Sequence, residues 1–107
     1  MALTAKRITE NFKELEDLNN EAFPKEERVS IERMIDLSQT GISDLYGVYD
    51  ENTFVGFFMT MTSDTCVYLF YLAICSSLRS HGYGGRTLKL MGDLYQRQIV
   101  LDMEPLD

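Results

Sequence analysis

The residues most able to do chemistry form one segment that combines glycines with arginines and hydrogen-bond donors. They are Arg79, Ser80, His81, Gly82, Tyr83, Gly84, Gly85 and Arg86. Three glycines within four positions disfavour the start of a helix, unless the backbone must approach a ligand closely. The N–H groups of a first helical turn bind phosphate oxygens, and arginines add charge-assisted hydrogen bonds. The segment therefore predicts a site for a phosphorylated ligand; the alternative is a tight structural turn between a strand and a helix.

Two well-known phosphate-binding patterns do not fit this segment. A Walker loop needs Gly-Lys-Ser/Thr, which does not occur in the chain. The dinucleotide pattern GxGxxG fails because its last position is occupied by Thr87. The glycines by themselves therefore leave the class of ligand open.

The charge distribution supports a small anion as the ligand. The 107 residues carry a net charge of −7, which argues against nucleic acid as the main partner. Residues 79–97 nevertheless hold four Lys or Arg and a single Asp. A basic island in an acidic chain suits a compact anionic ligand better than a long polyanion.

Composition and length predict one globular domain over residues 1–107. The longest apolar stretch, residues 67–75, is nine residues, whereas a membrane-spanning helix needs about 20. With no basic and apolar leader at the N-terminus, we expect a cytoplasmic protein without membrane contact. Cys66 and Cys75 lie outside any CxxC or Cys/His pattern, so we expect reduced thiols and no metal site.

The first part of the chain predicts one strand and two helices. Residues 2–8 are typical of a short strand. Thr9 or Asn11 is predicted to cap a first helix, and Asn11 with Glu14 has the spacing of a capping box. Apolar residues recur every three or four positions from Phe12 to Ala22 along this helix. Ser30 is predicted to cap a second helix that ends near Gly41.

The second part predicts four more strands and a helix. Strands are expected over residues 45–49, 53–62 and 66–74, and the unbroken apolar run of the third indicates burial on both faces. A helix follows the glycines, and residues 99–103 form the last strand. The order β-α-α-β-β-β-α-β predicts an α+β fold, in which a mixed, mostly antiparallel sheet has flanking helices and a parallel final pair.

Two segments together resemble the acyl-CoA motif of the GNAT superfamily of N-acyltransferases. They are Leu72-Ala73-Ile74 at a strand end, and the run from Arg79 to Gly84 that matches Arg/Gln-x-x-Gly-x-Gly/Ala. The resemblance implies the acyl-CoA N-acyltransferase fold, acetyl-CoA as cosubstrate and an amine acceptor on a small molecule or peptide. It also implies that the backbone of residues 72–74 pairs with the pantetheine arm and that N–H groups of residues 81–85 hold the pyrophosphate. The last strand would diverge from its neighbour to open a cleft.

The GNAT family normally continues past the fifth strand with a helix and two strands. That part usually supplies a tyrosine that protonates the leaving thiolate, so we expect the C-terminal part of the fold to be missing here. Glu104 is the candidate general base, against the alternative of a solvated carboxylate, and His81 is more plausible as a donor beside the phosphates than as a base. An uncovered fifth strand predicts a homo-oligomer, a dimer or higher.

Three functions follow from these observations. The first is an acetyl-CoA-dependent N-acetyltransferase, a transferase that acetylates a small amine or the N-terminal or lysine amine of a peptide. The second is a catalytically inactive module that binds CoA or a partner. The third is an unrelated α+β domain whose glycines are structural.

Overall fold

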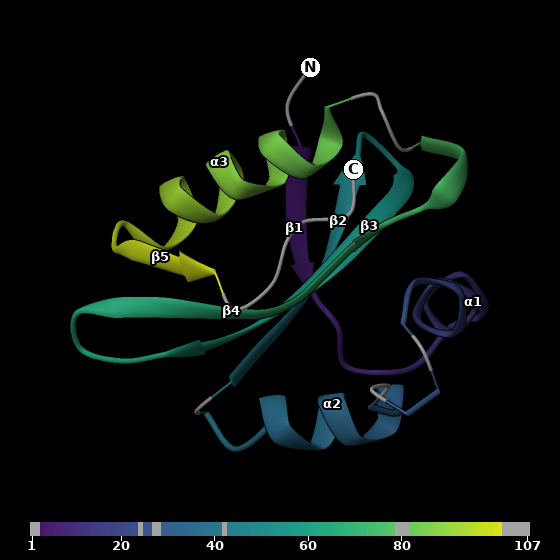
Figure 1. Cartoon of the computed structure of the whole chain (residues 1–107), viewed down its shortest axis with the longest axis horizontal. Coiled ribbons are helices and arrows are strands. Elements are labelled where there is room, and N and C mark those ends of the chain that lie inside the picture. Colours follow the sequence, from purple (N-terminus) through teal and green to yellow (C-terminus); the bar gives the residue numbers. More distant parts are fainter. Residues whose placement is uncertain (1–2, 24, 27–28, 42, 79–81, 102–107) are drawn as a thin grey trace.

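The computed structural model describes residues 3–23, 25–26, 29–41, 43–78 and 82–101 (Figure 1). The elements follow the predicted order. They are β1 (Leu3–Arg7), α1 (Lys13–Ala22), α2 (Ile31–Ser38), β2 (Ser43–Asp50), β3 (Thr53–Thr62), β4 (Cys66–Ile74), the 3-10 turn η1 (Ser76–Leu78), α3 (Tyr83–Tyr95) and β5 (Gln98–Leu101). None of the helices in these ranges is long and apolar enough to cross a membrane.

The five strands form one sheet in the order β1-β2-β3-β4-β5. Neighbouring strands are antiparallel, except that β4 and β5 are parallel and are joined through α3. Helices α1 and α2 cover one face of the sheet, and α3 covers the other (Figure 1). The predicted mixed sheet with flanking helices is therefore confirmed.

Each face of the sheet has its own apolar core. Successive residues of a strand point to opposite faces, so Phe57 packs with α1 and α2 while Phe58 packs with α3, and both are fully buried. The same geometry explains the apolar run in β4, where residues 72–74 are fully buried. Burial on both faces does not hold at the start of that strand, because Tyr68 is 41% exposed. This correction reflects the position of Tyr68 toward the β3–β4 turn, at the end of the sheet away from α1 (Figure 1).

One of the two predicted helix caps is present. The Ser30 Oγ accepts a hydrogen bond from the Arg33 N–H at 3.2 Å, as the sequence predicts for α2. The capping box at α1 is wrong, because Phe12 is the N-cap and no side chain caps the helix. Asn11 instead donates from Nδ2 to Glu32 at the start of α2, at 2.9 Å. Asn11 Nδ2 also donates to Glu16 of α1 at 3.3 Å, so this side chain links the start of α1 to α2 instead of capping α1.

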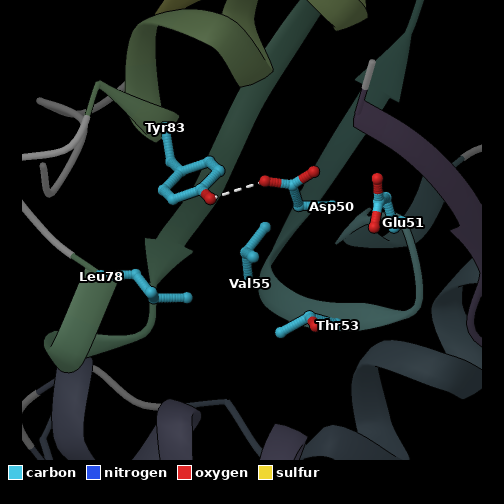
Figure 2. Close-up of a pocket in the computed structure, with 6 residues that line it drawn as sticks. All are labelled: Asp50, Glu51, Thr53, Val55, Leu78 and Tyr83. Carbon is cyan, nitrogen blue, oxygen red and sulfur yellow. Dashed lines mark hydrogen bonds between the residues drawn. The ribbon is translucent and has the colours of Figure 1, made fainter. Parts of the chain in front are cut away.

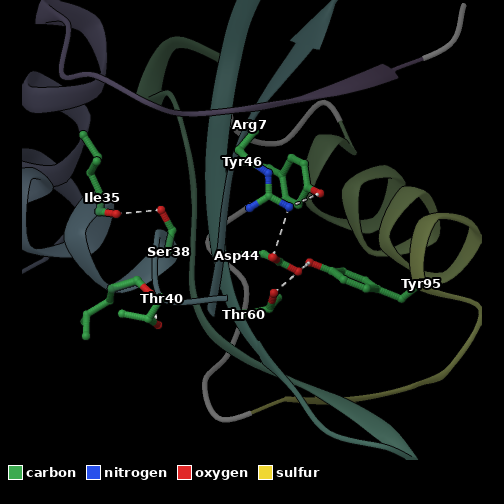
Figure 3. Close-up of polar contacts among 9 residues, drawn as sticks. Arg7, Ile35, Ser38, Thr40, Asp44, Tyr46, Thr60 and Tyr95 are labelled. Atoms are coloured by element: carbon green, nitrogen blue, oxygen red, sulfur yellow. Dashed lines mark hydrogen bonds and ion pairs between the residues drawn. The ribbon is translucent and has the colours of Figure 1, made fainter. Parts of the chain in front are cut away.

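Helix α3 is fastened to β2 at both of its ends. Tyr83, its first residue, donates a hydrogen bond to Asp50 Oδ2 at 2.7 Å. Tyr95, its last residue, donates to Asp44 Oδ2 at 2.8 Å (Figure 3). The twelve residue steps from Tyr83 to Tyr95 rise about 18 Å along the helix, and the six steps from Asp44 to Asp50 span about 20 Å along the strand. The matching lengths let one strand hold both ends of the helix.

The C-terminal contact is part of a larger polar network. The Thr60 hydroxyl lies 2.8 Å from the Tyr95 hydroxyl, and Asp44 also pairs with Arg7 at 3.2 Å (Figure 3). Burial is the main cause that raises the pKa of Tyr95 well above its ordinary value, and the Asp44 carboxylate adds to the rise. The hydroxyl therefore stays protonated in the folded protein at a pH where it ionises in the unfolded chain.

This raised pKa predicts a specific loss of stability at alkaline pH. A tyrosine ionises near pH 10 in the unfolded chain, so the stability that Tyr95 contributes is complete below about pH 10 and falls as the pH rises above it. Tyr95→Phe should be about 1 kcal/mol less stable at pH 8, but it should lose less stability than the native chain between pH 9 and 11. Urea unfolding across this range measures both. Identical pH slopes for the two proteins would contradict the assignment.

Candidate functional site

The glycine-rich segment begins α3 on the far side of a short turn from β4. After Ile74 the chain passes through η1, and the Leu78 N–H donates to the Cys75 carbonyl at 2.8 Å. Gly82 is the N-cap of α3 and has φ 78°, a left-handed conformation that favours glycine. Arg79, Ser80 and His81 lie outside the described residues. A structural turn therefore accounts for the glycine at position 82.

Packing does not account for the glycine at position 85. Gly85 lies in the first turn of α3, it is exposed, and a Cβ built on it would meet nothing within 4 Å. Any helix-forming residue would fit there, and glycine destabilises a helix by up to about 1 kcal/mol relative to alanine. A bare backbone at an exposed first turn is what close approach of an anion requires. Gly84, between the two, is buried.

Tyr83 and Arg86 place an ordered positive charge on the same turn. The Arg86 guanidinium lies over the Tyr83 ring, 4.9 Å from its centroid. Tyr83, Asp50, Val55 and Leu78 line one cavity of about 190 Å3, and the Tyr83 hydroxyl points toward Asp50 (Figure 2). Its hydrogen bond to the Asp50 carboxylate is the main cause that raises the pKa of Tyr83, so the hydroxyl remains a donor.

The strand β4 carries a bulge that the sequence did not reveal. Met59 of β3 pairs with Tyr71 and Thr60 pairs with Leu69, so Phe70 is an extra residue in β4. The ladder described between β4 and β5 runs from the Cys66–Gln98 pair to the Leu69–Leu101 pair. A bulge bends its strand, and here the bend follows directly on the last pair of that ladder.

Residues 72–74, beyond the bulge, place their side chains in the two apolar cores. Leu72 and Ile74 belong to the core under α3, and Ala73 belongs to the core under α1 and α2. All three are fully buried. Gly56 of β3 faces this segment, and a Cβ there would overlap the carbonyl oxygen of Ala73. The backbones of β3 and β4 thus approach each other closely where the site residues begin.

A second cavity, of about 210 Å3, lies between α1 and the end of β4. Its lining combines acidic and small residues, namely Glu14, Asp17, Leu18, Glu21, Cys75, Ser76 and Ser77. Three carboxylates in one wall disfavour a phosphate there. Of the predicted site residues, the structure thus brings the glycines and Arg86 together at the start of α3, while Glu104 lies outside the described residues.

The cysteines, possible metal ligands and Asp50 complete the description of the residues able to do chemistry. Cys66 and Cys75 lie near opposite ends of β4, and neither forms a disulfide. In the part of the chain that the structure describes, no three His, Cys, Asp or Glu side chains gather as metal ligands would. Asp50 is the contact of the turn that sequence reasoning missed, because it lies 33 residues before Tyr83 and no local pattern connects them.

Comparison with models of known protein families found no match for the sequence, nor did comparison with curated proteins. Solved structures with a similar fold do exist. A protein from Bacteroides thetaiotaomicron described as an acetyltransferase of the GNAT family is 29% identical and superposes with a TM-score of 0.80. The match covers 92% of the present chain and 58% of that protein, so the present chain spans little more than half of its relative's length.

Two further structures support the same fold. A GNAT-family acetyltransferase from Elizabethkingia anophelis with acetyl-CoA bound has 20% identity and a TM-score of 0.58, over 92% of this chain and 63% of that one. A ribosomal-protein-alanine N-acetyltransferase from Brucella melitensis has 12% identity and a TM-score of 0.69, over 96% and 81%. The observed fold is therefore the one that the sequence resemblance implies. From β1 to β5, the chain has the fold of the GNAT N-acetyltransferases.

Proposed function

We propose that this chain binds acetyl-CoA and that it serves the transfer of the acetyl group to an amine. The observation that carries the proposal is the junction of a bulged β4 with an exposed, glycine-bearing first turn of α3. The strand offers backbone groups for an extended arm, and the turn offers N–H groups for a diphosphate. The acetyl-CoA bound to the Elizabethkingia anophelis protein of the same fold supports this choice of ligand.

Each predicted residue has a proposed role in binding. The N–H groups of Gly82, Tyr83, Gly84 and Gly85, with Ser80 and His81 upstream, would hold the diphosphate. Arg86, ordered against Tyr83, and Arg79 would offset its charge. The backbone of residues 72–74 would hydrogen-bond the pantetheine arm as an added strand does. These assignments use the sequence motif together with the observed start of α3.

The proposed reaction depends on the alignment of the amine with the thioester, and it needs no covalent enzyme intermediate. A neutral amine nitrogen attacks the thioester carbonyl carbon, the carbon–sulfur bond breaks, and the amine proton and the thiolate must each find a partner. Glu104 stays the predicted base for the amine proton. The acceptor proposed is an amine of a small molecule or of a peptide.

The alternative is an inactive module that keeps coenzyme binding and lacks turnover. One experiment separates the two functions. Calorimetric titration with acetyl-CoA should give one site per chain, and a panel of small amines and peptides should then be tested for release of free thiol. Binding with turnover supports the enzyme, and binding without turnover across the panel supports the module. A folded chain that does not bind acetyl-CoA would contradict both.

Self-association and a cytoplasmic location also remain predictions. Light scattering of the purified chain tests the first, and a clean monomer at micromolar concentration would overturn it.

A further inference from the structure

The two tyrosines that fasten α3 to β2 differ in what they can influence. Tyr95 lies at the end of the helix and contacts Thr60 and Asp44 of the sheet. Tyr83 lies within the glycine-rich turn itself, between Gly82 and Gly84. The two hydroxyls make similar hydrogen bonds to aspartates of one strand, about 18 Å apart along the helix. Only the N-terminal contact can set the geometry of the turn directly.

The Asp50 side chain is held under conditions that stability alone does not favour. It is only 9% exposed, and its Oδ2 accepts the hydrogen bond from Tyr83. Its Oδ1 is buried without a hydrogen-bond partner among the described residues. A buried carboxylate oxygen without a donor is unfavourable. A buried Asp50 with one unpaired carboxylate oxygen, at the edge of a candidate site, suggests a role beyond packing.

The Tyr83 ring connects the Asp50 carboxylate to the Arg86 guanidinium. Asp50 fixes the hydroxyl end of the ring at 2.7 Å, and the Arg86 guanidinium lies 4.9 Å from the ring centroid. Arg86 is three residues further along the same helix, so ring and guanidinium share one face of the first turn. The three side chains form a series that starts in β2 and ends at the positive charge of the turn (Figure 2 shows the Asp50–Tyr83 contact).

We propose that Asp50 and Tyr83 are positioning residues that hold the first turn of α3 and the Arg86 guanidinium in the orientation that meets a diphosphate. The inference rests on the proposed binding of acetyl-CoA. The carboxylate does not touch the ligand, and it acts through the tyrosine hydroxyl. The Tyr83 hydroxyl thus lies between the negative Asp50 carboxylate and the proposed site of the negatively charged diphosphate.

The test compares two variants that each remove one hydroxyl from the same helix. Tyr83→Phe should weaken acetyl-CoA binding about threefold to tenfold, the effect of one hydrogen bond, whereas Tyr95→Phe should bind within twofold of the native chain. Both should unfold more easily. Asp50→Ala should reproduce Tyr83→Phe, and Asp50→Asn should restore affinity because its amide oxygen still accepts from Tyr83. Equal affinity in Tyr83→Phe, Tyr95→Phe and the native chain would overturn the inference.

A second measurement keeps this inference separate from the proposed function. Amide hydrogen exchange without any ligand should show faster exchange at Arg86, whose N–H donates to the Gly82 carbonyl at 3.1 Å, in Tyr83→Phe, and no such change there in Tyr95→Phe. If the native chain fails to bind acetyl-CoA, the proposed function falls, and exchange alone then decides whether Asp50 and Tyr83 order the turn. Unchanged exchange at the Arg86 amide in Tyr83→Phe would overturn the positioning role.

Discussion

Gly85→Glu should weaken the binding of acetyl-CoA roughly tenfold to a hundredfold while the chain stays folded. The position is exposed and a Cβ there meets nothing within 4 Å, so the new side chain has room. A helix gains stability when glycine is replaced and when a carboxylate lies in its first turn. The same carboxylate would lie beside the proposed diphosphate, where repulsion of about 1–3 kcal/mol lowers affinity roughly tenfold to a hundredfold. Calorimetry measures the affinity, and thermal unfolding measures the stability.

Gly85→Gln is the matched control for this prediction. Glutamine has nearly the same size as glutamate and no charge, so it separates repulsion from steric exclusion. We expect Gly85→Gln to bind acetyl-CoA more tightly than Gly85→Glu. A buried neighbour such as Gly84 would be a poor choice, because a charged side chain there would disturb folding. If Gly85→Glu bound acetyl-CoA with native affinity, the diphosphate would not lie at the first turn of α3.

Gly56→Ala should destabilise the fold more than Gly47→Ala. The new Cβ would overlap the Ala73 carbonyl oxygen, which is backbone and cannot turn aside. Relief requires β3 and β4 to move apart within two apolar cores, and overpacking of this kind costs about 3 kcal/mol. For a domain of this size that lowers Tm by roughly 10–20 °C. Thermal and urea unfolding of the purified variant test the prediction.

Gly47→Ala provides the comparison on the neighbouring strand β2. Its Cβ would lie 3.1 Å from Cε1 of the Tyr49 ring, which can shift by a few tenths of an ångström. We expect a loss below about 1 kcal/mol. Similar losses in both variants would mean that the close approach of β3 to Ala73 is not the source of the effect. A destabilised Gly56→Ala would also indicate that the close packing of β3 against residues 72–74 of β4 stabilises the fold.

The sequence predicted those features that depend on residues close together in the chain. The α3 start follows from the glycine cluster, and the cap of α2 follows from Ser30, three positions before the N–H that it accepts. Strand boundaries follow from turn residues between apolar runs, as at β2 and β3. Such local preferences act before any tertiary contact forms, and they therefore leave a readable pattern.

Other features had no pattern to read. The bulge at Phe70 is hidden because both faces of β4 are largely apolar, so a slip of one residue changes no alternation. The prediction of a capping box was wrong because the Asn11 side chain contacts Glu16 and Glu32, and Glu32 lies 21 residues away.

By itself, the sequence determined the order of the elements, the mixed sheet and the place of the glycine-rich turn. Only the tertiary structure decided how that turn is held, because the Asp50–Tyr83 and Asp44–Tyr95 hydrogen bonds join residues 33 and 51 positions apart. It also distinguished Gly82, whose positive φ explains the glycine, from Gly85, where a Cβ would meet nothing within 4 Å. The physical reason is that hydrophobic periodicity and turn preferences are encoded locally, whereas a contact between a strand end and a helix start exists only after the sheet has packed.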